Sequence, residues 1–312
     1  MRAVRLNEYG GRDVLHVIEV ERPEPAPGHV VVHVVAAGIN PGEAAIREGR
    51  LHEQFPAQFP SGQGSDLAGV VSAVGEGVTD LSVGDEVLGY SWGRSSQAEY
   101  VSVPAHQLVP KPAALGWLEA GALYMPAATG TGAVEAVAPR PGETVVVSAA
   151  AGGVGVVVTQ LLLLAGVRVL AIASAANHDW LRERGAEPVA YGDGLADAVR
   201  ALAPDGVDAL IDLYGPEYVD LGLELGVDPD RIESIIAFAR AAEIGGHTAG
   251  SVDGSRPEVL AHVAGLVACG ELVLPIAATF PLEEVREAYA QLEQRHTRGR
   301  IVLVIDPERA GG

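Results

Sequence analysis

A run of small residues from Ser148 to Gly155, SAAAGGVG, has the composition of a turn that lies against a phosphate group. It follows the apolar segment Thr144–Ala149, which predicts a buried strand, and leads into Gly153–Ala165, which predicts a helix. Small residues let the backbone approach a pyrophosphate, and the free N–H groups and dipole at a helix start bind its oxygens. Strand, glycine turn and helix in this order form the context of a dinucleotide-binding motif. Ala150 replaces the first glycine of that motif, and an ordinary tight turn before a buried helix is the alternative interpretation.

The end of the next predicted strand, Val167–Ala173, indicates which dinucleotide would bind. An acidic residue there would bind the ribose 2′-hydroxyl of NAD. The sequence instead continues Ser174-Ala-Ala-Asn177-His178, and the next acid falls within the following predicted helix. Ser174 and Asn177 can donate hydrogen bonds to a 2′-phosphate, and His178 or Arg182 can add positive charge, so NADPH is favoured. The alternative is that Ser174 and Asn177 only cap a helix.

The elements that must position these residues follow two different patterns, one in the first part of the chain and one in the rest. Roughly the first 110 residues read as short strands between Gly and Pro turns, such as Val30–Ala36, Gly69–Val74 and Asp85–Leu88. After Pro112 a predicted helix over Leu118–Val137 leads into alternating strands and helices. This alternation predicts an α/β fold with a Rossmann doubly wound parallel sheet, joined to a β-rich domain. Further strands are expected at Val207–Leu213, Ile232–Phe238, Leu272–Leu274 and Arg300–Ile305, and further helices at Tyr218–Leu225, Glu258–Cys269 and Leu282–Gln294.

Composition excludes several classes of function. The formal net charge of −20 argues against binding nucleic acid or anionic membranes. Cys269 is the only cysteine and Lys111 the only lysine, so an intrachain disulfide, a multi-cysteine zinc site and most lysine chemistry are excluded. The N-terminal residues show no signal peptide, and the apolar stretch Val154–Ala176 is interrupted by polar residues. We therefore expect a cytoplasmic protein whose partner is a small molecule.

Six segments, in a consistent order along the chain, carry a resemblance to a known family. The segment Ala149–Gln160 reads AAAGGVGVVVTQ. The others are Ala36–Glu43 (AAGINPGE), Pro60–Gly75 (PSGQGSDLAGVVSAVG), Val83–Val87 (VGDEV), Gly121–Thr129 (GALYMPAAT) and Gly299–Leu303 (GRIVL). On these segments the chain resembles the zinc-independent quinone oxidoreductases of the medium-chain dehydrogenase/reductase superfamily.

The resemblance implies a particular domain organisation. A GroES-like domain would span residues 1–115 and be completed by the tail, residues 276–312. A Rossmann domain that binds NADPH would span residues 116–275. The resemblance also implies a homodimer through the Rossmann domain.

The resemblance also implies a set of cofactor-binding residues. Asn40 and Thr129 would lie near the nicotinamide, although an asparagine before Pro41 is also expected in a turn. Ala151, Gly152, Gly153 and Val154 would form the pyrophosphate loop. Ser174 and Asn177 would bind the 2′-phosphate, Tyr191 would lie beside the adenosine phosphate, and Arg300 stands where the family often has a lysine. Asn177 itself departs from the lysine often found at its position.

The zinc alcohol dehydrogenases of the superfamily have a cysteine where this chain has Asn40, and a His-Glu pair where it has Ser65-Asp66. An amide and a hydroxyl are poor zinc ligands, so we expect no catalytic zinc. Without a Lewis acid, hydride transfer to an electrophilic, conjugated acceptor is the expected reaction.

The expected function is NADPH-dependent reduction of a quinone or a similar conjugated carbonyl compound. Ala45 and Leu51 replace tyrosines found in some quinone oxidoreductases, which leaves reduction of enone or enoyl C=C bonds as an alternative. An NADPH-binding protein with little catalytic activity is an alternative of another class. A short-chain dehydrogenase is excluded, because no tyrosine precedes Lys111 at the required spacing.

Overall fold

A computed structural model describes residues 1–311 and divides the chain into two compact units. The first comprises Met1–Met125 and Leu260–Gly312, and we call it the β-rich unit. The second comprises Pro126–Val259, and we call it the parallel-sheet unit. Among residues 1–311, every helix is too short or too polar to span a bilayer. The predicted domain limits, 1–115 with 276–312 and 116–275, stay a prediction.

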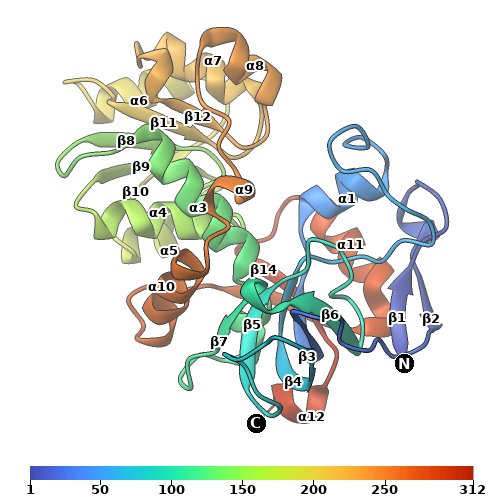
Figure 1. Cartoon of the computed structure of the whole chain (residues 1–312). Coiled ribbons are helices and arrows are strands. Elements are labelled where there is room, and N and C mark those ends of the chain that lie inside the picture. Colours follow the sequence, from blue (N-terminus) through green and yellow to red (C-terminus); the bar gives the residue numbers. More distant parts are fainter. Residues whose placement is uncertain (312) are drawn as a thin grey trace. The chain divides into compact units, whose positions relative to one another are not determined.

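The parallel-sheet unit is built on one five-stranded sheet in the order β10-β9-β8-β11-β12, with all neighbours parallel (Figure 1). The chain enters at the central strand and winds outward to both edges, which creates a switch point between β8 and β11. The strands are β8 (Thr144–Val147), β9 (Arg168–Ala173), β10 (Glu187–Ala190), β11 (Ala209–Asp212) and β12 (Ile232–Ser234).

Helices cover both faces of this sheet because its strands are apolar on both sides. Val145 and Val147 belong to a core with α4 and α5, whereas Val146, which points the other way, belongs to a core with α6 and α7. This arrangement confirms the predicted α/β class with a doubly wound parallel sheet. The helices are α3 (Tyr124–Val137), α4 (Gly155–Leu164), α5 (His178–Glu183), α6 (Leu195–Leu202), α7 (Pro216–Glu224), α8 (Phe238–Ile244) and α9 (Ser251–Gly254), with short 3-10 turns at Ala175–Asn177 and Pro229–Arg231.

The β-rich unit holds a seven-stranded sheet and a separate two-stranded one. The larger sheet runs β13-β14-β3-β4-β5-β7, with β6 paired to β3. Strand β14 pairs antiparallel with β3, so strands from the last part of the chain lie in the same sheet as strands β3 to β7. The strands are β1 (Arg2–Arg5), β2 (His16–Glu19), β3 (His29–Gly38), β4 (Asp66–Val74), β5 (Glu86–Tyr90), β6 (Tyr100–Pro104), β7 (Leu108–Pro110), β13 (Ile276–Pro281) and β14 (Arg300–Val304).

Helices α1 (Pro41–Arg47), α2 (Trp117–Gly121), α10 (Pro257–Ala268), α11 (Val285–Glu293) and α12 (Pro307–Ala310) complete the helical elements. Short 3-10 turns lie at Arg12–Val14, Ala105–Gln107 and Leu282–Glu284. Leu282, Val285, Ala288 and Tyr289, around and within α11, belong to the same apolar core as the inner faces of β3 and β4.

Three predicted elements differ from the observed ones. The predicted helix Leu118–Val137 is two helices, because the chain breaks between α2 and α3. The predicted strand Ile232–Phe238 ends at Ser234, whose Oγ accepts the N–H groups of Ile236 and Ala237 and turns the chain into α8. The segment Leu272–Leu274 is buried at both ends but lies in no strand, so burial alone produced its strand-like pattern.

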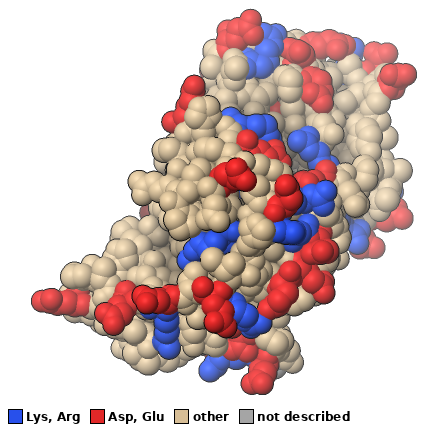
Figure 2. Space-filling view, turned by 90° about the vertical axis from the view of Figure 1, so that its right-hand side faces the viewer, with Lys and Arg blue, Asp and Glu red and all other residues tan. Residues whose placement is uncertain are grey.

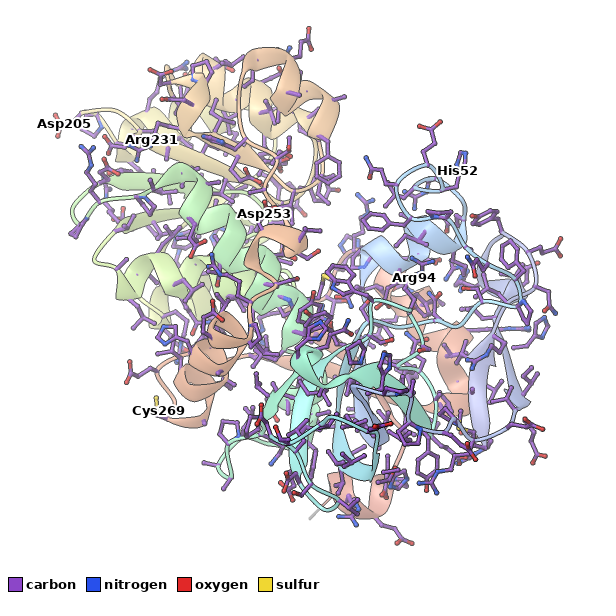
Figure 3. The ribbon with its side chains drawn as sticks, in the orientation of Figure 1. His52, Arg94, Asp205, Arg231, Asp253 and Cys269 are labelled. Carbon is purple, nitrogen blue, oxygen red and sulfur yellow. The ribbon has the colours of Figure 1, made fainter. Side chains whose placement is uncertain are left out.

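Glu233 is a fully buried carboxyl group on β12, beside Ile211 of β11. Its Oε2 accepts the Ala249 N–H at 3.1 Å, whereas its Oε1 has no hydrogen-bond partner within residues 1–311. Burial raises the pKa of Glu233 to about 8; the Ala249 N–H opposes this shift, and the carboxylates of Asp253 (Figure 3) and Asp212 reinforce it. Glu233 is therefore held in the neutral form at neutral pH.

The substitution Glu233→Gln should flatten the pH dependence of the free energy of unfolding. The carboxyl ionises near pH 4.5 in the unfolded chain and near pH 8 in the folded one, so between these values the folded chain binds one more proton and loses stability as pH rises. Wild type should lose about 2 kcal/mol between about pH 6 and pH 8 through this group. Urea unfolding at both pH values measures this loss. The control is Glu183→Gln, at a position where the side chain is exposed. Equal slopes for wild type and Glu233→Gln would contradict the assignment.

Candidate functional site

The carboxyl ends of the five parallel strands meet along one edge of the sheet. The segments that follow the five strands therefore leave the sheet side by side, in the order of the strands. In that order, these segments contain Tyr191, Ser174, Ala150, Tyr214 and Ile236. Ligands of doubly wound sheets bind at this edge, around the switch point, which here lies between Ala150 and Tyr214.

The turn after β8 has the backbone geometry that its sequence predicts. The Gly152 N–H donates to the Ala149 carbonyl at 2.8 Å, and the Ala150 N–H donates to Ile172 of β9 at 3.1 Å. Ala149 takes a φ of +45°, in the left-handed region that favours glycine. A Cβ atom on Gly155 would lie 2.2 Å from the Ala149 carbonyl oxygen, so α4 can begin this close to the turn only with glycine at this position.

The start of α4 offers backbone donors for an anion. Within residues 1–311, the N–H groups of Gly153, Val154 and Gly155 donate to no protein acceptor. Gly153 and Val154 are only half-buried, whereas Gly155 is buried at the base of the turn. Helix α4 has ten residues, so its dipole adds to their attraction for negative charge. The turn therefore fits a pyrophosphate, and its backbone does not require that the first motif position be glycine.

A buried carboxylate holds the ends of three strands together beneath this turn. Asp212 accepts the Ser148 hydroxyl at 2.8 Å and the Ser234 hydroxyl at 2.7 Å. It also accepts the N–H groups of Tyr214 at 2.9 Å and Gly215 at 3.1 Å. Ser148 in turn accepts the Leu213 N–H, which ties β8 to the segment after β11. Asp212 thus fixes the segments after β8, β11 and β12 relative to one another.

The segment after β9 contains the two residues predicted to bind a 2′-phosphate. The Asn177 amide donates to Ser174 Oγ at 3.0 Å, which leaves the Ser174 hydroxyl hydrogen available to a ligand. Ser174 and Asn177 stand at the N-cap positions of the turn Ala175–Asn177 and of α5, but neither side chain accepts a hydrogen bond from a helix N–H, so their role in binding a 2′-phosphate stays a prediction. Tyr191 is exposed directly after β10, the strand that neighbours β9.

Thr129 lies on α3, where the helix makes close contacts on two sides. A Cβ on Gly130 would lie 3.3 Å from Val157 of α4. A Cβ on Gly254 of α9 would lie 1.9 Å from the Ala128 carbonyl oxygen. Thr129 itself is buried, so α4 and α9 together fix its position. Its proximity to a nicotinamide stays a prediction.

The other two predicted residues, Asn40 and Arg300, lie in a buried polar cluster of the β-rich unit. The Asn40 amide donates to Glu43 Oε1 at 3.0 Å, and Glu43 Oε2 accepts the Asn40 N–H at 3.1 Å, so Asn40 caps the start of α1. Arg300 donates to Asp66 Oδ2 at 2.6 Å. Burial raises the pKa of Asp66 to about 7, although the Arg300 guanidinium favours the ionised form. Asn40 and Arg300 therefore both have structural partners, and their roles in cofactor binding stay predictions.

Glu43 extends this cluster toward α11. Its Oε1 also accepts the Ser65 N–H at 2.7 Å, and its Oε2 accepts the Tyr289 hydroxyl at 2.7 Å. The Tyr289 oxygen accepts both the Gln63 and the Gln97 amides at 2.9 Å. Asn40, Glu43, Ser65 and Tyr289 thus form one buried hydrogen-bonded network around the Glu43 carboxyl group.

Zinc does not fit the residues present at the positions where the zinc enzymes bind it. Asn40 contributes an amide that already bonds Glu43, and the Asp66 carboxylate is taken by the positive charge of Arg300. Among the described residues, no group of three His, Cys, Asp or Glu side chains is arranged to hold a metal ion. Cys269 is exposed after α10, where its Sγ lies 3.5 Å from Glu271 Oε1 (Figure 3).

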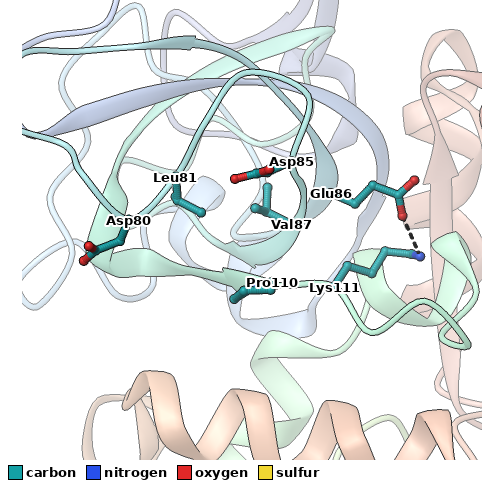
Figure 4. Close-up of a pocket in the computed structure, with 7 residues that line it drawn as sticks. All are labelled: Asp80, Leu81, Asp85, Glu86, Val87, Pro110 and Lys111. Atoms are coloured by element: carbon teal, nitrogen blue, oxygen red, sulfur yellow. Dashed lines mark hydrogen bonds and ion pairs between the residues drawn. The ribbon is translucent and has the colours of Figure 1, made fainter.

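A surface hollow of about 290 Å³ in the β-rich unit is a less promising site (Figure 4). Asp80, Asp85 and Glu86 make its lining acidic, and Lys111 Nζ lies 3.1 Å from Glu86 Oε2. The one cation of the lining is thus already paired. The hollow has neither free donors for an anion nor an enclosed apolar wall, so the carboxyl edge of the parallel sheet remains the candidate site.

Sequence reasoning missed Asp212, together with the roles of Ser148 and Ser234. The sequence did contain a signal: Asp212 is a charged residue at the end of the otherwise apolar strand Ala209–Asp212, directly before Leu-Tyr-Gly. A buried strand end with a charged residue indicates a group that satisfies backbone N–H groups at the edge of the sheet.

Comparison with known proteins identifies the family of the chain. Residues 26–113 match the model of the alcohol dehydrogenase GroES-like domain, and residues 184–303 match that of a zinc-binding dehydrogenase. The chain is 30% identical to the mouse synaptic vesicle membrane protein VAT-1 homolog, over 99% of this chain and 85% of that protein. It is 33% identical to rat quinone oxidoreductase, over 72% of this chain and 70% of that protein. A mycobacterial protein solved in complex with NADPH is 27% identical, with a TM-score of 0.85 over 98% of this chain and all of that one.

The substitution Gly155→Ala should lower the free energy of unfolding by about 1–3 kcal/mol, because the new Cβ overlaps the Ala149 carbonyl. Chemical denaturation measures the loss. Gly265→Ala is the matched control: this glycine lies in α10, and its added Cβ would meet nothing within 4 Å. The control should be neutral or slightly stabilising. A neutral Gly155→Ala variant would show that α4 can move away from the turn.

At about pH 9, above the Asp66 pKa of about 7, Arg300→Met should lower the free energy of unfolding by about 3 kcal/mol, because it leaves an ionised Asp66 carboxylate buried without its counter-charge. Adding Asp66→Asn to the same chain removes that carboxyl and should recover more than half of the loss. Chemical denaturation of both single variants and the double variant gives the coupling. Strictly additive losses would mean that the pair does not stabilise the β-rich unit.

Proposed function

Because the chain belongs to the quinone oxidoreductase family of the medium-chain dehydrogenase/reductase superfamily, we propose that it transfers hydride from NADPH to a quinone or a similar conjugated carbonyl acceptor, without zinc. The observation that carries the proposal is the glycine turn at the start of α4. Its free N–H groups at the switch point supply the anion site that a dinucleotide needs. A mycobacterial relative in complex with NADPH makes this cofactor the natural candidate.

In this proposal, each part of the cofactor has its own group of residues. Ala151, Gly152, Gly153 and Val154 hold the pyrophosphate through their backbone. Ser174 and Asn177 bind the 2′-phosphate, because they are hydrogen-bond donors at a strand end that carries no acid. Tyr191 lies beside the adenosine phosphate, Thr129 and Asn40 lie near the nicotinamide, and Arg300 supports the site from the buried pair that it forms with Asp66.

The proposed reaction is compatible with the absence of a Lewis acid. Bound NADPH supplies the hydride. A conjugated carbonyl compound spreads the incoming negative charge over several atoms, so it needs less electrostatic help than a simple ketone. The protein's task is then to bind the two reactants in order and to hold them at a reactive distance. A homodimer through the Rossmann domain, which the family resemblance implies, and a cytoplasmic location, which the sequence alone led us to expect, belong to the same proposal.

NADPH oxidation in the presence of a quinone and, separately, of a simple enone tests the proposal. We expect turnover with NADPH and a higher kcat/KM for the quinone. A higher kcat/KM for the enone would favour C=C reduction instead. NADPH binding without turnover on either acceptor would identify the chain as a cofactor-binding protein and contradict the proposal.

The substitution Ser174→Asp tests the cofactor preference. An acid at this strand end repels a 2′-phosphate and accepts the 2′-hydroxyl of NADH, so the ratio of the NADPH to the NADH dissociation constants should rise by about tenfold or more. Asp at the exposed position 176 (Ala176→Asp) adds the same charge nearby and is the control. An unchanged ratio for Ser174→Asp would contradict the assigned 2′-phosphate site.

A further inference from the structure

Three large apolar side chains stay exposed at one end of the carboxyl edge of the parallel sheet. Tyr214 is 42% exposed, Ile236 is 48% exposed and Phe238 is 39% exposed. We call these three residues the apolar ledge. Exposed apolar residues scattered singly are common, but a group at a ligand-binding edge indicates a binding surface.

Register and hydrogen bonds place the ledge. Tyr214 and Ile236 each follow, two residues on, one member of the register pair Asp212 and Ser234, which ends the neighbouring strands β11 and β12. Their backbones are tied to the same carboxylate. The Tyr214 N–H donates to Asp212, while the Ile236 N–H donates to Ser234 Oγ at 3.2 Å, and that hydroxyl donates to Asp212. These hydrogen bonds fix the backbone of Tyr214 and Ile236. The Tyr214 ring also packs edge-to-face against the Tyr218 ring, with 5.9 Å between the ring centroids.

The ledge lies on the side of the switch point opposite to the proposed adenosine site. Ser174 and Tyr191 belong to β9 and β10, whereas the ledge follows β11 and β12. A dinucleotide that binds its pyrophosphate at the central turn, with its 2′-phosphate near Ser174, extends its other half across the switch point. On the proposed function, on which this inference rests, that half carries the nicotinamide, so the ledge borders the place where hydride leaves the cofactor.

Charge around the ledge disfavours an anionic acceptor. No Lys or Arg lies between Leu213 and Glu217 or between Ser234 and Ala239. The next arginine, Arg240, is paired with Asp220 and Glu243, each at 2.8 Å. The whole chain carries a net charge of −20, and Figure 2 shows acidic and basic side chains interspersed over the face that it presents. The two segments that carry the ledge thus offer no cation to an acceptor that bears phosphate groups, and the net charge of the chain repels it at longer range.

We propose that the apolar ledge selects neutral, apolar conjugated acceptors, such as quinones or enones with a hydrocarbon substituent, and disfavours enoyl thioesters of a phosphorylated carrier. Tyr214 and Ile236 contact the hydrocarbon part of the acceptor and exclude water from it. They are specificity-determining residues and hold no charge or proton for the reaction.

The test compares an unsubstituted quinone, the same quinone with an alkyl chain, and an enoyl thioester of coenzyme A. Tyr214→Ser and Ile236→Ser should each lower the preference in kcat/KM for the alkyl quinone over the unsubstituted one by about tenfold, with the NADPH dissociation constant unchanged. Leu202→Ser, on α6, removes an apolar side chain that is also 39% exposed and serves as the matched control. Wild type should use the thioester least.

Binding of the alkyl quinone to the protein loaded with NADP⁺, measured by calorimetry, gives a second readout that needs no turnover. The two ledge variants should weaken this binding by a similar factor, and Leu202→Ser should not. Absence of turnover with all three acceptors would contradict the proposed function. In that case the titration would still show whether Tyr214 and Ile236 bind the alkyl chain of the acceptor. Unchanged binding and preference in both ledge variants, or preferential use of the thioester by wild type, would overturn the inference.

Discussion

Asp212 is a buried carboxylate that accepts hydrogen bonds from two serine hydroxyls and two backbone N–H groups at the carboxyl edge of the parallel sheet. A charge taken out of water costs several kcal/mol unless donors replace its hydration, so such a group persists only where the surrounding chain supplies them. Ser148 and Ser234 are two of those donors; Ser148 in turn accepts the Leu213 N–H of the segment after β11, and Ser234 accepts the Ala237 N–H of its own following segment. The positions of three loops at this edge depend on this arrangement.

These three loops define the two halves of the proposed site. The loop after β8 is the glycine turn, whose free N–H groups face the anion site at the start of α4. The loops after β11 and β12 carry Tyr214 and Ile236, which remain exposed although they are apolar. On the other side of the turn, Ser174 and Asn177 form a polar pair. The polar pair Ser174 and Asn177 thus lies on one side of the switch point and the apolar ledge on the other, with Tyr191 exposed beyond the polar pair.

Sequence patterns predicted the parts of this fold that depend on local chemistry. The strand, turn and helix around Gly155 were predictable because close backbone packing there demands small residues. The length of β12 was not, because Ser234 ends the strand through hydrogen bonds that depend on Asp212, far away in the sequence. The pairing of Arg300 with Asp66 was also hidden, since it joins residues at opposite ends of the chain. Polar partners distant in sequence leave no periodic signal, so the apolar pattern predicts the sheet while the buried polar groups must be seen in the structure.

Amide hydrogen exchange with and without NADPH tests most directly whether the turn before α4 is the cofactor site. The N–H groups of Gly153, Val154 and Gly155 donate to no protein acceptor within residues 1–311 and should therefore exchange quickly in the free protein. NADPH should slow their exchange strongly, because they donate to its pyrophosphate. NADPH should also slow amide exchange around Ser174–Asn177, and it should leave amide exchange at the hollow beside Lys111 unchanged. Saturating NADPH that leaves the exchange of these three amides unchanged would contradict the account.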